Sequence, residues 1–100
     1  MLPLNLASHL TERYDVSWQP KALKALRRID NPDRVRLIRA SQALGRNPFP
    51  GKSRRVIGPD DVFRIRVGSY RLLYTVENTK LLILVLTVGH RRDVYRLNLD

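Results

Sequence analysis

Residues 62–76, VFRIRVGSYRLLYTV, decide the fold of this chain. Apolar and polar side chains alternate on either side of Gly68-Ser69, which is the pattern of two half-buried strands joined by a turn. A two-residue turn with glycine first favours a type II′ β-hairpin. Residues paired across such a hairpin point to the same side, so counting outward from the turn assigns each side chain to a face. The predicted core face carries Phe63, Ile65, Val67, Tyr70, Leu72 and Tyr74.

Three arginines of this hairpin are expected on the other face, where Arg64 and Arg66 from the first strand meet Arg71 from the second. Like charges directly opposite each other in a sheet are destabilising, by roughly 0.2–1 kcal/mol. A protein tolerates such a group either because a solvated basic surface aids solubility or because an anion sits between the charges. Both interpretations are open from the hairpin alone.

The apolar run LLILVLTV, residues 81–88, predicts a third strand that is apolar on both faces and therefore lies inside the sheet or is covered. In an antiparallel meander its far end lies near the Gly68 turn. The polar stretch GHRRDVYR, residues 89–96, would then emerge beside the hairpin arginines. The candidate site predicted in this way comprises Arg64, Arg66, Arg71, His90, Arg91, Arg92 and Tyr95.

The segments before the hairpin predict one strand and two helices. YDVSWQP, residues 14–20, alternates as a strand, and Pro20 is well suited to open a helix. Asn31-Pro32 is a second helix start, and Gly45 is expected just after the end of that helix. The apolar stripes of the two helices are predicted to be Ala22, Leu23, Leu26 and Ile29, then Val35, Leu37, Ile38, Ser41 and Leu44.

Residues 46–61, RNPFPGKSRRVIGPDD, are expected to be a loop because prolines and glycines are frequent there. The loop carries Lys52, Arg54 and Arg55. The element order is β-α-α-β-β-β. This order predicts an α+β domain with a helical hairpin packed on one face of a small, mainly antiparallel sheet. We expect a single domain over residues 14–100, preceded by an arm over residues 1–13.

The composition limits the functional classes. The net charge is +10 and the pI is about 11.1, which favours a polyanionic partner such as nucleic acid. There are no cysteines, so disulfides and thiolate metal sites are excluded and a cytoplasmic protein is expected. No segment has about 20 consecutive apolar residues, so we expect no membrane partner. The first ten residues, MLPLNLASHL, make a poor signal peptide.

The available side chains also limit the chemistry. Two histidines without clustered carboxylates do not favour a catalytic metal, and no glycine-rich phosphate loop or serine nucleophile motif is present. RNA cleavage that uses the substrate's own 2′-OH needs only groups that stabilise phosphate charge and groups that move protons. Arginine serves the first purpose and histidine the second. We therefore expect no metal and no cofactor.

FRIRVGSYRLLYTV, residues 63–76, followed by VLTVGHRRDVYR, residues 85–96, resembles the RelE toxins of type II toxin–antitoxin systems. The resemblance covers residues 14–96. It implies a RelE-like fold and a ribosome-dependent mRNA endonuclease, an mRNA interferase, that cleaves in the ribosomal A site by metal-independent 2′-OH attack. It also implies a RelB-like antitoxin, ribosomal RNA and mRNA as partners, and a toxin–antitoxin hetero-oligomer. With such partners, the general RNA or ribosome contacts are expected to be Lys52, Arg54, Arg55 and Arg92.

The same resemblance implies roles for three residues. Arg71 matches the arginine that stabilises phosphate charge, Arg91 matches an arginine on the leaving side, and Tyr95 matches a tyrosine that orients the nucleotide. The chain has Arg64 and Arg66 where a well-known RelE toxin has lysines, and arginine is a poor general base. His90 is therefore the predicted base, with Tyr95 and Lys52 as weaker alternatives, and a histidine satisfied within a turn as the structural alternative.

Two other functions are open from the sequence. A ParE-like toxin of the same fold inhibits DNA gyrase and cleaves nothing, and it does not need the closing histidine, arginine and tyrosine. A non-catalytic basic module would bind RNA or DNA through charge alone. The two-sided apolar strands speak mildly against this last alternative, because they suggest a surface that a partner covers.

Overall fold

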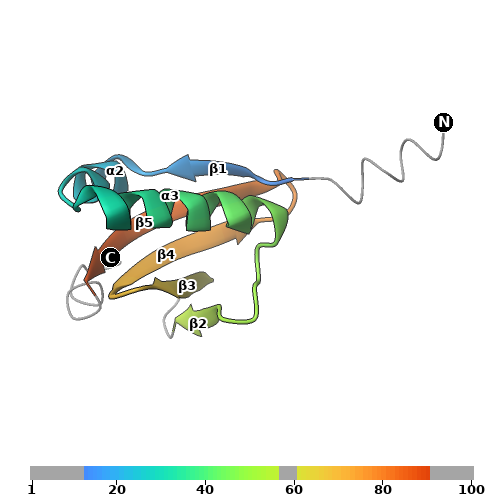
Figure 1. The fold of residues 1–100 in the computed structure, drawn as a ribbon. Coiled ribbons are helices and arrows are strands. Elements are labelled where there is room, and N and C mark those ends of the chain that lie inside the picture. Colours follow the sequence, from blue (N-terminus) through green and yellow to red (C-terminus); the bar gives the residue numbers. More distant parts are fainter. Residues whose placement is uncertain (1–12, 57–60, 91–100) are drawn as a thin grey trace.

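The computed structural model describes residues 13–56 and 61–90, which form a five-stranded sheet with two helices on one face (Figure 1). This architecture confirms the predicted α+β class and the helical hairpin. The elements in chain order are β1 (Asp15–Trp18), α2 (Pro20–Arg27), α3 (Asn31–Arg46), β2 (Arg54–Val56), β3 (Val62–Val67), β4 (Tyr70–Glu77) and β5 (Leu82–His90). The predicted arm lies outside the described residues except for Arg13.

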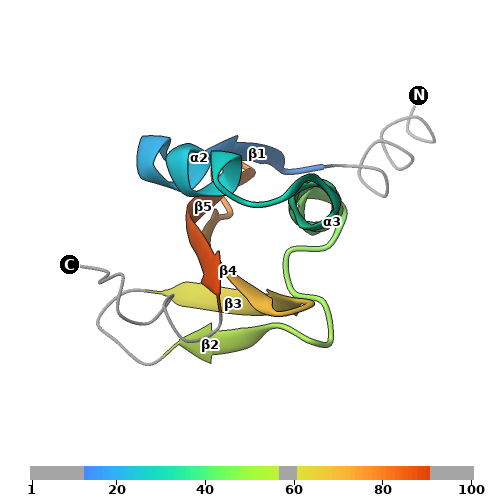
Figure 2. The ribbon, with the colours of Figure 1, turned by 60° about the vertical axis from the view of Figure 1, so that its left-hand side comes forward.

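The strand order in the sheet is β1-β5-β4-β3-β2. Strands β3, β4 and β5 form the predicted antiparallel meander, and β1 joins β5 in parallel. Because β1 and β2 are the two edge strands, β2 and β3 lie far from β1 and α2 (Figure 2). Strand β5 lies inside the sheet, between β1 and β4, which explains why its sequence is apolar on both faces.

The hairpin register is as predicted. Val67 pairs with Tyr70, and Arg66 pairs with Arg71. Gly68 has a φ of 62°, and among the described residues other than glycine only Leu81 has a positive φ. A turn whose first central residue alone has a positive φ is the type II′ turn that the glycine-first sequence favours.

The predicted loop between the helices and the hairpin is wrong in one part, because it contains strand β2. Arg54 pairs with Arg64, and Val56 pairs with Val62, so β2 extends the sheet at its edge. Val56 packs against Val62 and the buried Leu73, which gives this short strand an apolar anchor. A strand of three residues does not show enough alternation for a sequence pattern to reveal it.

Strand β5 runs further than the sequence indicated and contains a bulge. It ends at His90 instead of Val88. Tyr74 pairs with Val85 and Leu73 pairs with Thr87, so Leu86 is an extra residue on β5. Each bulge of this kind shifts the alternation of side chains between the two faces by one residue.

Glycine 45 has a different role from the predicted helix stop. Helix α3 continues through Gly45 to Arg46, and the backbone N–H of Tyr14 donates to the Gly45 carbonyl at 2.8 Å. A Cβ atom at position 45 would lie 2.8 Å from the Tyr14 carbonyl oxygen and 3.3 Å from the Val16 Cγ2 atom. The glycine therefore allows α3 to pack closely on β1.

The core lies between the helices and the sheet. Its helix residues match the predicted stripes in part, because Leu23, Val35 and Ile38 are exposed. Its buried members are Ala22, Leu26, Ile29, Leu37, Leu44, Ile65, Leu72, Tyr74, Ile83, Val85 and Val88. A smaller cluster of Val62 and Leu73 lies on the other face of the sheet. Within residues 13–56 and 61–90, neither helix is long and apolar enough to cross a membrane.

Candidate functional site

Four arginines share the face of the sheet that the helices do not cover. The register pairs Arg54 with Arg64 and Arg66 with Arg71, and residues opposite each other point to the same side. We call the surface formed by Arg54, Arg64, Arg66 and Arg71 the arginine face. The three hairpin arginines are thus brought together as predicted. Arg54 joins them because β2 is a strand, whereas the sequence pattern predicted a loop at this position.

Arg71 is the most unusual residue of the arginine face. Only 9% of its surface is exposed, and in the described part of the chain its Nε atom has no hydrogen-bond partner. An arginine side chain does not lose its proton in proteins, so the positive charge stays. A buried donor without a partner costs about 1–3 kcal/mol, and an anion that binds there would offset this cost. The geometry therefore favours an anion at Arg71.

The neighbour of Arg71 on β5 is Gly89, which directly faces it. No side chain from that position stands beside the guanidinium. His90, the next residue, faces Tyr70 instead, and the two ring centroids are 6.0 Å apart in an edge-to-face arrangement. The His90 side chain therefore lies on the helix-side face with Tyr70. The structure separates it from the three hairpin arginines, with which the sequence had grouped it.

The three basic residues of the predicted loop take separate positions. Arg54 belongs to the arginine face, where its Nη1 atom donates to the carbonyls of Gly51 at 2.9 Å and Ser53 at 2.8 Å. Arg55 pairs with Phe63, which puts it on the other face, and it forms an ion pair with Asp61. Lys52 lines a hollow of about 170 Å³ next to Leu44 and Ile65. All three are exposed, as general RNA contacts require.

The remaining predicted site residues, Arg91, Arg92 and Tyr95, lie outside the described residues. Their predicted roles stay predictions. Among the residues that the structure describes, no group of three or more histidine, aspartate or glutamate side chains is arranged to hold a metal ion. What the described arrangement can do chemically is to bind a phosphate and stabilise additional negative charge on it, because guanidinium groups present paired donors to phosphate oxygens.

The sequence is similar to known toxins over most of its length. A family model described as the ParE toxin of the type II toxin–antitoxin system parDE matches residues 16–95. A RelE-like toxin protein of Escherichia coli is 31% identical over 88 residues, which cover 85% of this chain and 93% of that protein.

Solved structures show the same fold. The toxin–antitoxin complex RelBE2 of Mycobacterium tuberculosis contains a chain that matches with a TM-score of 0.72 and 24% identity, over 81% of this chain and 94% of that one. A chain of the intact RelBE complex of Escherichia coli matches with a TM-score of 0.67 and 26% identity, over 77% of this chain and 95% of that one. The fold is thus that of RelE-like proteins.

Proposed function

Because the chain belongs to the RelE/ParE superfamily of toxins from type II toxin–antitoxin systems, we propose that it is a ribosome-dependent endoribonuclease that cleaves mRNA. The observation that carries this proposal is the buried Arg71, whose Nε atom has no hydrogen-bond partner among the described residues, beside the like-charged Arg66. A site that keeps two cations next to each other is suited to a group with more than one negative charge. The phosphate in the transition state of RNA cleavage is such a group.

In the mechanism that we propose, the 2′-OH of the substrate attacks the adjacent phosphate and the 5′-oxygen leaves, which yields a 2′,3′-cyclic phosphate and a free 5′-OH. Arg71 binds the non-bridging oxygens, and Arg64 and Arg66 add positive charge. Charge stabilisation of this kind is worth roughly 10²–10³-fold in rate per donor group. No metal is needed, because the nucleophile is part of the substrate.

We propose His90 as the group that takes the 2′-OH proton. Its ring lies on the other side of the sheet from Arg71, but the two residues are close at the end of β5, where Gly89 lies between them without a side chain. To contact both residues, a nucleotide would bend round the end of β5 next to Gly89. Arg91 on the leaving side and Tyr95 against the base complete the proposed site.

The proposed partners are a cognate antitoxin, the ribosome with its RNA, and mRNA. The antitoxin is supported by the solved neighbours, which include toxin–antitoxin complexes. We propose that the toxin and antitoxin form a hetero-oligomer in the cytoplasm.

The experiment that tests this function is a translation reaction with purified ribosomes, a defined mRNA and the full-length toxin. We expect cleavage only when ribosomes carry the mRNA, as mapped by primer extension. A second mRNA with a 2′-deoxy nucleotide at the mapped position should resist cleavage, because the nucleophile is missing. Cleavage of the 2′-deoxy message at the same bond would contradict the mechanism.

A second candidate function is inhibition of DNA gyrase, which is supported by the family model because that model describes ParE toxins. The two functions are separated by one pair of assays. Intact mRNA on ribosomes together with inhibited supercoiling by gyrase would favour the ParE-like function, and the reverse result would favour the endoribonuclease.

A further inference from the structure

An apolar hollow lies on the helix side of the molecule, between the end of α3 and β3. Its volume is about 170 Å³. Its floor is formed by Leu44 and Ile65, which are almost fully buried core residues. Its walls are formed by Ala40, Ala43 and Pro50. We call this space the α3–β3 hollow, and its lining indicates a site for an apolar group.

The space in the α3–β3 hollow exists because the helix contributes small side chains. Ala40 and Ala43 are spaced i and i+3 on α3, so both present only a methyl group to the same space. An apolar cavity of about 150 Å³ is large enough to bind benzene. The hollow can therefore accept one large apolar side chain, such as that of a phenylalanine in a partner protein.

The wall opposite α3 is held in place by hydrogen bonds. The buried Tyr74 hydroxyl donates to the Pro48 carbonyl at 2.6 Å. The Ser53 backbone N–H donates to the Pro50 carbonyl at 2.8 Å, which closes a turn around the lining residue Lys52. A wall that is already ordered loses little conformational entropy when a partner binds, so the hollow is prepared for a ligand.

Apolar surface continues from the hollow to Phe49. This residue is 47% exposed, and its ring packs edge to face on Phe63 with the ring centroids 4.9 Å apart. Phe49 directly precedes Pro50, so the ring and the hollow belong to neighbouring parts of one surface. An exposed aromatic ring beside an apolar hollow is typical of the centre of a protein–protein interface.

The charge around the hollow indicates which partner fits. Among the described residues that line it, the polar ones are Asn47 and Lys52, and both are exposed. The net charge of the chain is +10, which favours an acidic partner and disfavours a second copy of this chain. An RNA base is also disfavoured, because most of its polar edge would face alanine, leucine and proline side chains without a hydrogen-bond partner.

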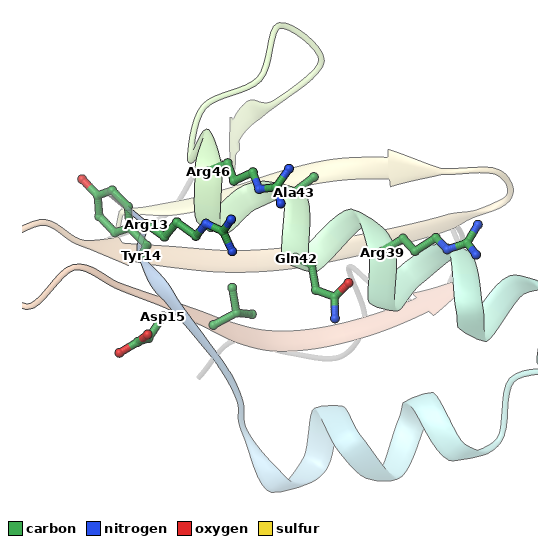
Figure 3. Close-up of a pocket in the computed structure, with 9 residues that line it drawn as sticks. Arg13, Tyr14, Asp15, Arg39, Gln42, Ala43 and Arg46 are labelled. Atoms are coloured by element: carbon green, nitrogen blue, oxygen red, sulfur yellow. The ribbon is translucent and has the colours of Figure 1, made fainter. Parts of the chain in front are cut away.

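A larger hollow of about 790 Å³ lies between α3 and the start of β1 (Figure 3). Its lining includes Arg39, Asp15 and Val16, so basic, acidic and apolar groups are mixed there and no single class of ligand is selected. Ala43 lines both hollows, whereas Gln42 lines the larger one and is absent from the lining of the α3–β3 hollow. Position 42 therefore provides a control for substitutions at position 43.

We propose that the α3–β3 hollow is a docking site for an acidic peptide segment of a partner protein, which places one large apolar side chain in the hollow and a carboxylate near Lys52. The inference rests on the proposed function, in which the partner protein is the cognate antitoxin. Ile65 pairs with Leu72 on the core side of the sheet. A segment that docks there therefore leaves the arginine face, on the other side, open.

The test uses the full-length toxin and a fluorescein-labelled acidic peptide with one central phenylalanine. A second peptide has alanine at the centre and is otherwise identical. The variant that fills the hollow is Ala43→Leu, since position 43 is exposed and leucine is a good helix former. The matched control is Gln42→Leu, which adds a leucine at the neighbouring exposed position outside the hollow. Affinity is measured by fluorescence anisotropy, and urea unfolding checks the fold of each variant.

We expect the wild type to bind the phenylalanine peptide about tenfold more tightly than the alanine peptide, because burial of a phenylalanine side chain contributes on this order. The preference should fall to about twofold or less in Ala43→Leu and should persist in Gln42→Leu. Lys52→Gln should weaken the binding of both peptides about threefold and keep the preference. Lys80→Gln removes the same charge from an exposed position outside the hollow and should have a smaller effect.

Equal affinity of the wild type for the two peptides would overturn the docking site. A tenfold preference that persists in Ala43→Leu would also overturn it, because the apolar side chain would then bind elsewhere. Equal weakening by Lys52→Gln and Lys80→Gln would remove Lys52 from the site. Loss of affinity for a 2′-O-methyl RNA in Ala43→Leu, with both peptides bound equally, would overturn the proposal in favour of RNA.

The antitoxin is tested as its purified complex with the full-length toxin. We expect the complex of Ala43→Leu to dissociate about tenfold faster than that of Gln42→Leu, and equal rates would overturn the antitoxin as the occupant. Neither measurement involves cleavage. A wild-type chain that cleaves no mRNA on ribosomes contradicts the proposed endoribonuclease and can still show the peptide preference. A wild-type chain that cleaves mRNA and binds the two peptides equally removes the docking site alone.

Discussion

Arg71 on β4 lies directly opposite Gly89 on β5, and the bulge at Leu86 is the reason. Without the extra residue, Val88 would face Arg71 and would fill the space beside its guanidinium. The bulge shifts the register by one residue, so that the position without a side chain stands next to the buried cation. Bulges are frequent near functional sites because they redirect side chains in this way.

A side chain at position 89 should therefore reduce activity without unfolding the protein. We expect Gly89→Val to lower mRNA cleavage on ribosomes at least tenfold, because a side chain about 5 Å from that of Arg71 would occupy the place of the phosphate. Valine favours strands, so the free energy of unfolding should be unchanged or higher. Urea unfolding and primer extension measure the two effects. Full activity of Gly89→Val would contradict a phosphate bound between position 89 and Arg71.

The pairing of Arg66 with Arg71 should lower the stability of the protein while it supports cleavage. Replacing Arg66 by glutamine removes one of two like charges that face each other, so we expect the free energy of unfolding to rise by about 0.2–1 kcal/mol at low salt. The gain should shrink in 0.5 M KCl, where screening weakens the repulsion. Cleavage should fall in the same variant.

The control for this variant is Lys80→Gln, which removes one charge from an exposed turn. If Lys80→Gln stabilises the protein as much as Arg66→Gln does, the gain comes from the lower net charge and the pairing contributes nothing.

Gly45 should be sensitive to the smallest substitution. In Gly45→Ala, the new Cβ would meet the Tyr14 carbonyl oxygen at 2.8 Å, and β1 would have to move away from α3. We expect a loss of about 1–3 kcal/mol in the free energy of unfolding, in spite of the better helix propensity of alanine. Gly51→Ala is the matched control, because nothing lies within 4 Å of its added Cβ. Similar unfolding curves for the two variants would contradict the close packing of α3 on β1.

The sequence predicted the hairpin, the meander, the helices and three of the four arginines of the arginine face, because period-two alternation and a glycine-first turn fix a register. It did not predict β2, whose three residues are too few for a pattern. It also misplaced His90. Residues 81–88 are apolar on both faces, so their sequence does not reveal a bulge at Leu86, and this one extra residue decides which face His90 takes. The sequence pattern placed Gly45 at a helix end, because the close packing of α3 on β1 that requires this glycine cannot be recognised from one sequence.

The proposed role of His90 is tested by its substitution. We expect His90→Gln to lower cleavage roughly 10²-fold, which is the lower range for a lost general base. Tyr70→Phe keeps the ring that packs against His90 at 6.0 Å and should change cleavage little. A His90→Gln variant with wild-type cleavage would assign the proton transfer to another group.

Tyr74 links the core to the segment that leads into β2, and it gives the stability a predictable pH dependence. Its buried hydroxyl donates to the Pro48 carbonyl at 2.6 Å, so Tyr74→Phe should cost about 0.5–1.5 kcal/mol of unfolding free energy at pH 8.

Burial raises the pKa of Tyr74 above its usual value of 10.0, because the charged phenolate is poorly solvated in the core. The folded state thus holds the proton more tightly than the unfolded state does. This contribution to stability is fully present below pH 10 and is lost as the pH rises further. The difference in unfolding free energy between wild type and Tyr74→Phe should therefore narrow between pH 8 and pH 11, since all other groups titrate in both proteins. A difference that stays constant over this range would contradict the burial of a neutral phenol at this position.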